Sequence, residues 1–87
     1  MQEPFKKSDT KRMQVLFFGA LADITGTEIL EIEITNDTDK IKETLLLLYP
    51  ALKKQTFKMA LNQSVLTGKQ TLKEGDVIAL LAPFAGG

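Results

Sequence analysis

The chain has 87 residues, of which 44% are hydrophobic and 25% are charged, as in ordinary globular proteins. A chain of this length forms one small domain, because a second hydrophobic core would need more residues. Its eleven basic and eleven acidic residues cancel, which excludes the excess of positive charge that attracts nucleic-acid phosphates or an anionic membrane.

Two missing residue types limit the chemistry further. Without Cys or His, the chain has no thiol nucleophile, no imidazole base, no disulfide and no Cys/His metal site. Its longest apolar runs, at 45–49 and 77–84, are much shorter than the ~18 residues that span a bilayer. Residues 1–12 lack the apolar segment of a secretory signal. We therefore expect a cytoplasmic protein with no nucleic-acid or membrane partner, no metal and no intrinsically bound cofactor.

The first third of the chain predicts a leader and two strands. Residues 1–12 show neither helical nor strand periodicity and are expected to form a flexible leader, with the domain at 13–82. Residues 13–19 are rich in β-branched and aromatic residues, which favours a strand that is apolar on both faces. Residues 20–24 predict a short helical turn. Residues 28–34 alternate between apolar and acidic residues, which is typical of a half-exposed strand.

One main helix is predicted after the second strand. Its candidate N-caps are Asn36, Asp37 and Thr38. The apolar residues expected in the core, at i, i+4 and i+7, are Ile41, Leu45 and Leu48. Pro50 ends the helix. Leu46 and Leu47 cannot both face inward on a 3.6-residue period, so their role is left open.

The second half predicts a connection and three more strands. After the connecting residues 51–56, strands at 57–61 and 64–67 flank Asn62-Gln63, a dipeptide that can form a hairpin turn. Residues 77–82 form a last strand without a polar residue. Two strands, a helix and three strands favour an α+β fold, a β-grasp roll with a mixed sheet of about five strands. In this fold the first and last strands lie side by side and one helix packs on one face.

The last residues, Pro83-Phe84-Ala85-Gly86-Gly87, predict an extended tail. Pro83 disfavours helix and cannot donate a ladder hydrogen bond, and the two glycines have no side chain. Five residues reach roughly 16 Å. Such a tail can enter a partner's tunnel and present the carboxylate of Gly87 to reactive groups there.

A carboxylate is a poor electrophile, and the chain lacks a nucleotide-binding loop to activate it. Gly68-Lys69 is similar to the end of a P-loop, but Gln63 and Gln70 replace the required Gly and Ser/Thr. Activation must then come from another protein. Without Cys, sulfur can be carried only as a C-terminal thiocarboxylate, made by adenylation of Gly87 and displacement of AMP by sulfide. A terminal diglycine also occurs without any function, so this pattern alone leaves function open.

Residues 13–87 resemble the small subunit of molybdopterin synthase, a ubiquitin-like sulfur carrier. The shared features are the opening VLFFG at 15–19, Gly26 after a short turn, Leu-Tyr-Pro at 48–50, Ala-Leu-Asn-Gln at 60–63, LKEGDV at 72–77 and APFAGG at 82–87. The chain departs from the family in having Ala82-Pro83 where a double Pro is usual, and in its leader. The diglycine is unaffected by either departure.

The resemblance implies a non-catalytic carrier that works with three partners. An E1-like enzyme uses ATP to adenylate Gly87, a sulfurtransferase system supplies sulfur, and the tail 83–87 enters the large synthase subunit in a heterotetramer. The thiocarboxylate then donates sulfur to precursor Z, which builds the dithiolene of molybdopterin. The resemblance also places Phe18, Val65 and Leu81 at the interface with the large subunit. Strand parity agrees, because one helix covers only one face of the sheet.

Other interpretations remain at this point. Phe18, Val65 and Leu81 could belong to an ordinary core. The chain could be the sulfur carrier for thiazole synthesis, or a ubiquitin-like modifier in which Gly87 forms an isopeptide bond with a lysine. It could also be a binding adaptor that does not need Gly87. The identity of the large partner separates these alternatives best.

Overall fold

The computed structural model describes residues 11–82. Its elements are β1 (Arg12–Phe17), α1 (Ala20–Thr25), β2 (Ile29–Glu33), α2 (Thr38–Leu48), the 3-10 helix η2 (Pro50–Lys54), β3 (Lys58–Leu61), β4 (Ser64–Val65) and β5 (Val77–Leu81). Strand β1 therefore begins one residue before the strand expected at 13–19. Residues 1–10 of the expected leader and the expected tail 83–87 lie outside the described residues.

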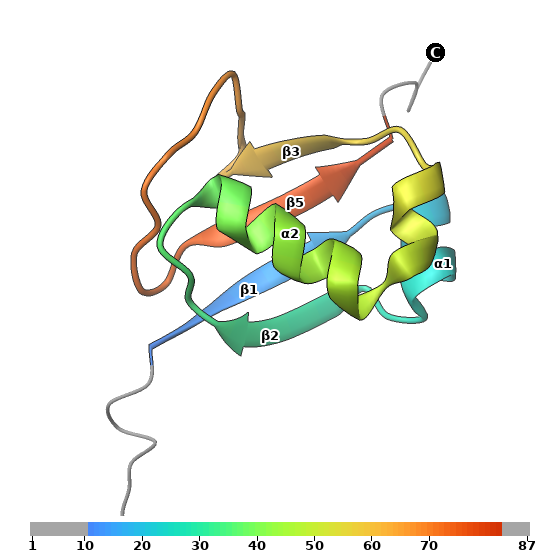
Figure 1. Cartoon of the computed structure of the whole chain (residues 1–87), viewed down its shortest axis with the longest axis horizontal. Helices are drawn as coiled ribbons and strands as arrows, with labels where there is room; N and C mark the ends of the chain where they lie inside the picture. Colours follow the sequence, from blue (N-terminus) through green and yellow to red (C-terminus); the bar gives the residue numbers. More distant parts are fainter. Residues whose placement is uncertain (1–10, 83–87) are drawn as a thin grey trace, which may run out of the picture.

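The five strands form one mixed sheet in the order β2-β1-β5-β3-β4. The first and last strands, β1 and β5, are parallel neighbours at its centre, and the other pairs are antiparallel. Helix α2 lies across one face of the sheet, while α1 and η2 lie at one end (Figure 1). The predicted α+β, ubiquitin-like β-grasp fold is confirmed.

The core lies between this face and α2, because alternate residues of the central strands point toward the helix. The fully buried side chains are Met13, Val15 and Phe17 from β1, Ile78 and Leu80 from β5, Leu21 from α1, Ile41 and Leu45 from α2, and Leu52 from η2. Each side chain of this kind contributes roughly 1.5–3 kcal/mol when it is removed from water. The sheet and the helix are therefore held together mainly by apolar burial.

Helix α2 begins at the predicted place, since the Asp37 carboxylate accepts a hydrogen bond from the backbone N–H of Lys40 at 2.9 Å. It also ends before Pro50 as predicted. The expectation that Leu48 is in the core is wrong, since its side chain is 52% exposed. Leu48 is the last residue of the helix, and Tyr49 covers the core there instead, with its ring 5.7 Å from that of Phe17 in an edge-to-face contact.

The two leucines whose role was open have different environments. Leu46 is partly buried and packs against the core, whereas Leu47 is 77% exposed. The segment expected to be a plain connection contains η2, which begins at Pro50. Proline fixes φ at a helical value, and Leu52 is completely buried, so one turn of 3-10 helix is stabilised there.

Candidate functional site

The face of the sheet opposite α2, here called the outer face, has no helix of residues 11–82 packed on it (Figure 1). The residues of β1 and β5 that alternate with the core residues point to this side. Several of them are apolar, so the described part of the chain leaves an apolar surface on this face. Exposed apolar surfaces of this kind are typical of contact sites for proteins, membranes or ligands.

A hollow of about 620 Å³ lies on the outer face. Its lining residues are Gln14, Leu16, Phe18, Ala60, Asn62, Gln63, Val65, Val77, Ala79 and Leu81. Phe18, Val65 and Leu81, which the family resemblance implied as interface residues, are all among them. Phe18 is 48% exposed and Val65 is 55% exposed. Ordinary core packing is therefore the wrong interpretation for these two side chains.

The strand register explains how distant parts of the sequence meet here. Leu16 pairs with Ile29 of β2 and with Ala79 of β5, and Ala60 pairs with Ala79 and with Val65. These residues form one apolar row across all five strands. Leu81 lies beside this row, two residues after Ala79 in β5, where it pairs with Lys58 of β3. Phe18 follows directly after the end of β1.

Ile29 also belongs to this surface, although the sequence did not single it out. Ile29 is 57% exposed and lies in the edge strand β2, at one end of the apolar row. The alternation in residues 28–34 already placed it on the face of Glu31 and Glu33. That pattern was a usable signal, but only the pairing of β2 with β1 shows that this face is the one that carries Phe18.

The turn between β3 and β4 borders the hollow and is held by a network that the sequence did not reveal. Asn62 and Gln63 have positive φ angles of 50° and 76°, which confirms the predicted two-residue hairpin turn. The Asn62 side-chain oxygen accepts a hydrogen bond from the N–H of Val77 at 2.9 Å. Its Nδ2 donates to the Asp76 carboxylate at 3.1 Å. The hairpin is thereby fixed to the start of β5.

Asp76 completes this network and is only 6% exposed. Its second carboxylate oxygen accepts a hydrogen bond from the backbone N–H of Lys73 at 2.8 Å. The hydrogen bond from Asn62, and then that from Lys73, lower the pKa of Asp76 below its ordinary value of 3.8, since both stabilise the charged form. Asp76 is thus a structural anion beside the hollow.

The hollow lies on the strand that precedes the predicted reactive group in the sequence. Leu81 is the last residue of β5, and Ala82 is the last described residue. The expected tail residues Pro83, Phe84, Ala85, Gly86 and Gly87 follow directly in the sequence but lie outside the described part. Anything bound in the hollow therefore lies against the strand from which the tail continues.

The described residues include no helix long and apolar enough to cross a bilayer. Within residues 11–82, no three acidic side chains gather in a way that could hold a metal ion.

Comparison with known proteins shows which proteins this chain is similar to. The model of the ThiS family matches residues 15–87. The molybdopterin synthase sulfur carrier subunit of Mycobacterium tuberculosis (strain ATCC 25618 / H37Rv) is 32% identical over 81 residues, covering 87% of this chain and 98% of that protein.

Solved structures show the same likeness. A chain of the complex of subunits 1 and 2 of the molybdopterin-converting factor from Helicobacter pylori 26695 is 32% identical, with a TM-score of 0.68 over 87% of this chain and 99% of that one. Small archaeal modifier protein 1 from Methanosarcina acetivorans shares the fold at 24% identity, with a TM-score of 0.74 over 90% of this chain and 98% of that one. The chain therefore belongs to the ThiS family, and its resemblance to the sulfur carrier subunit of molybdopterin synthase is confirmed.

Proposed function

We propose that this chain is the sulfur-carrying small subunit of a molybdopterin synthase. The observation that carries the proposal is the position of the apolar hollow on the central strand β5, which ends at Leu81, two residues before the tail begins at Pro83. A partner that fills the hollow would hold the base of the tail at a fixed point. The tail, about 16 Å long when extended, would then bring Gly87 to a defined place in that partner.

Phe18, Val65 and Leu81 would be the main apolar contacts of this partner. All three line the hollow, and the outer face has no cover of its own within the described chain. Burial of two exposed side chains of this size in an interface contributes about as much per area as burial in a core. We identify the partner as the large subunit of the synthase, because the similar Helicobacter pylori protein was solved in a complex of subunits 1 and 2.

The chemistry would take place on the Gly87 carboxylate in two balanced steps. An E1-like enzyme would attach AMP from ATP to this carboxylate and release pyrophosphate. A sulfurtransferase system would then supply sulfide, which attacks the carbonyl carbon while AMP leaves, so that C–S replaces C–O. The resulting thiocarboxylate would donate its sulfur to precursor Z within the large subunit. The described residues contribute positioning, and the partners contribute the catalytic groups.

Intact mass spectrometry tests the carrier step. The full chain is incubated with an E1-like activating enzyme, ATP and a sulfide source, and we expect its mass to rise by the difference between sulfur and oxygen. A Gly87 deletion variant serves as the control and should keep its mass. An unchanged mass of the full chain, in a reaction that thiolates a known carrier, would contradict the proposal.

Replacement of Gly86 tests the tail. Gly86→Val adds a β-branched side chain next to the terminal residue, so we expect sulfur transfer to precursor Z to be lost because the tail no longer fits a narrow tunnel. Circular dichroism should show an unchanged fold. Full transfer activity in this variant or in the Gly87 deletion would refute the mechanism.

A second candidate is the sulfur carrier for thiazole synthesis, since the matching family model carries the ThiS name. The thiocarboxylate chemistry would be the same, and only the acceptor would differ. Rescue of a strain that lacks its molybdopterin synthase small subunit, but not of one that lacks its thiazole carrier, supports the first candidate. The opposite result supports the second.

A further inference from the structure

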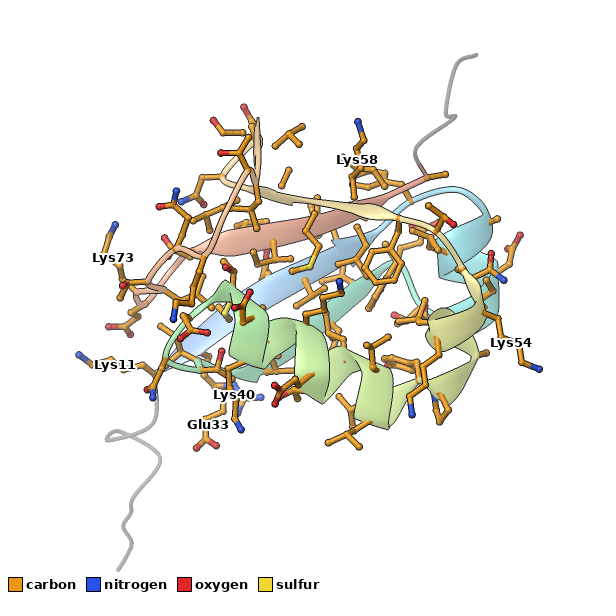
Figure 2. The ribbon with its side chains drawn as sticks, turned by 45° about the horizontal axis from the view of Figure 1, so that its top comes forward. Lys11, Glu33, Lys40, Lys54, Lys58 and Lys73 are labelled. Carbon is orange, nitrogen blue, oxygen red and sulfur yellow. The ribbon has the colours of Figure 1, made fainter. Side chains whose placement is uncertain are left out.

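The charged side chains that the five described strands place on the outer face lie near two opposite corners of the sheet. The charged residues of the five described strands are Arg12, Glu31, Glu33 and Lys58. The strand register places the first three together, because Arg12 pairs with Glu33 and Glu31 pairs with Gln14. Lys58 pairs with Leu81 at the other end of the face. Figure 2 shows Glu33 and Lys58 far apart, with Lys58 pointing away from α2.

The two corners differ in how their charges are balanced. At the corner formed by Arg12, Glu31 and Glu33, Nε of Arg12 lies 3.8 Å from Oε1 of Glu31. Lys58 has no acidic group within ion-pair distance among residues 11–82, since the ion pairs there join Arg12 to Glu31 and Lys40 to Glu43. Lys58 borders a neighbouring hollow of about 490 Å³, which Lys42, Asp39 and Val65 also line. Lys58 is thus an exposed cation without an ion-pair partner among residues 11–82, and it lies beside Leu81, which lines the outer-face hollow.

A partner that covers the apolar row would also approach Lys58. Val65 lines both hollows, and Leu81 lies directly beside Lys58 in the sheet. An ammonium group that loses water at an interface needs a hydrogen-bonding partner, and a carboxylate satisfies its charge as well. The position of Lys58 therefore favours a partner that has a carboxylate facing this residue.

We propose that Lys58 is a specificity-determining residue, which binds a carboxylate of the large subunit at the rim of the hollow and so fixes the orientation of docking. The inference rests on the proposed function and deepens it by naming one complementary group on the partner. In the reversed orientation, the same carboxylate would face Glu31 and Glu33 and be repelled. The preferred orientation keeps the Leu81 end of β5, and thus the base of the tail, next to this ion pair.

Binding measurements with the purified large subunit from the same organism test the proposal. The Lys58→Glu variant should raise the Kd about tenfold or more, because it places like charges together at the rim. Lys54→Glu changes net charge equally but lies on η2, away from the outer face (Figure 2), and should alter the Kd by less than about twofold. The loss caused by Lys58→Glu should shrink at about 0.5 M NaCl.

A charge reversal on the partner identifies the carboxylate. Single Asp→Lys and Glu→Lys variants of the large subunit are combined with Lys58→Glu, and one of them should restore binding. A Kd for Lys58→Glu equal to that of the original chain, an equal loss for Lys54→Glu, or no restoring reversal would each overturn the role of Lys58.

The Phe18→Asp variant separates this inference from the proposed docking surface. Loss of binding in Phe18→Asp, with unchanged binding in Lys58→Glu, would overturn the ion pair but leave the docking surface in place. Unchanged binding in both variants would overturn the docking surface, and the ion pair with it. Thermal melts should show that Lys58→Glu is folded, because Lys58 is exposed.

Discussion

At the scale of single residues, Asp76 has the most demanding role that the structure reveals. Its two carboxylate oxygens accept hydrogen bonds from Asn62 and from the backbone of Lys73, and its side chain is buried. An amide has only one acceptor oxygen, so it cannot satisfy both donors. The negative charge of Asp76 therefore stabilises the turn beside the hollow of the outer face.

Asp76→Asn should lower the free energy of unfolding by about 1–2 kcal/mol at pH 7, because one donor loses its partner. The pKa of Asp76 in the folded state lies below its ordinary value of 3.8. The charge of Asp76 therefore makes its full contribution to the free energy of unfolding above that value. This contribution is lost as the pH falls through the folded pKa. Urea unfolding at pH 7 and at pH 3 measures both effects.

Glu74→Gln is the matched control for Asp76→Asn, since Glu74 lies in the same turn but is exposed. Its free energy of unfolding should change by less than about 0.5 kcal/mol. An equal loss in both variants, or a difference between Asp76→Asn and the original chain that grows toward acid pH, would contradict the assigned role.

At the scale of elements, the local sequence leaves two questions open. One is the conformation of the β3–β4 turn, and the other is which leucines of helix α2 face the core. The hairpin turn uses Asn-Gln where Asn-Gly is preferred, and Gln63 has a φ of 76°. In α2, four consecutive leucines occupy 45–48, and one helix face cannot contain them all. Both elements therefore offer a direct test of the structure.

Gln63→Gly should raise the free energy of unfolding by about 0.5–1 kcal/mol. Glycine adopts this left-handed conformation without the steric cost of a Cβ atom, although it loses more chain entropy on folding. Gln63→Val should instead lower the free energy, because a β-branched residue is the least compatible with positive φ. Thermal or urea unfolding measures both variants, and a reversed order of the two would exclude this turn geometry.

Leu45→Ala should lower the free energy of unfolding by about 2–4 kcal/mol, because it leaves a cavity in the core. Leu45 is 1% exposed, whereas Leu47 is 77% exposed. Leu47→Ala, two residues along the same helix, should change the free energy by less than about 0.5 kcal/mol. Chemical denaturation compares them, and comparable losses would mean that the helix is rotated from its described position.

At the scale of the whole molecule, the two sides of the sheet have different tasks. One side packs against α2 and accounts for the stability of the fold. The outer face retains an apolar hollow next to the end of β5, which is unfavourable in water unless a partner covers it. This division allows stability and partner binding to be changed separately by mutation.

Phe18→Asp and Leu47→Asp form a matched pair for this division. Each variant replaces an exposed apolar side chain with a carboxylate. Phe18 lies on the outer face of the sheet, whereas Leu47 lies on the solvent side of helix α2. Both should remain folded, with melting temperatures near that of the original chain. Only Phe18→Asp should weaken binding to the large subunit, by about 2 kcal/mol or more, as measured by calorimetry. Equal affinities for the two variants would exclude the outer face as the interface.

The local pattern of the sequence was sufficient for most of the fold. Alternation in residues 28–34, the Asp37 N-cap and the stop at Pro50 act over a few residues, so they could be interpreted without a structure. The error at Leu48 has a different origin. Periodicity indicates which side of a helix is apolar. It does not show where the sheet beneath the helix ends, or that Tyr49 covers the core in place of Leu48.

The sequence by itself determined that this is one small β-grasp domain of near-zero net charge, without a thiol, an imidazole or a phosphate-binding loop. These properties follow from residue types and short-range spacing. Only the tertiary structure decided which strand faces coincide and that Ile29 joins Phe18, Val65 and Leu81 on the outer face. It also decided that Lys58 lies beside this face without an ion-pair partner in the described part of the chain. The physical reason is that strand register and the place of the helix depend on contacts between residues far apart in the chain, on which local patterns carry no information.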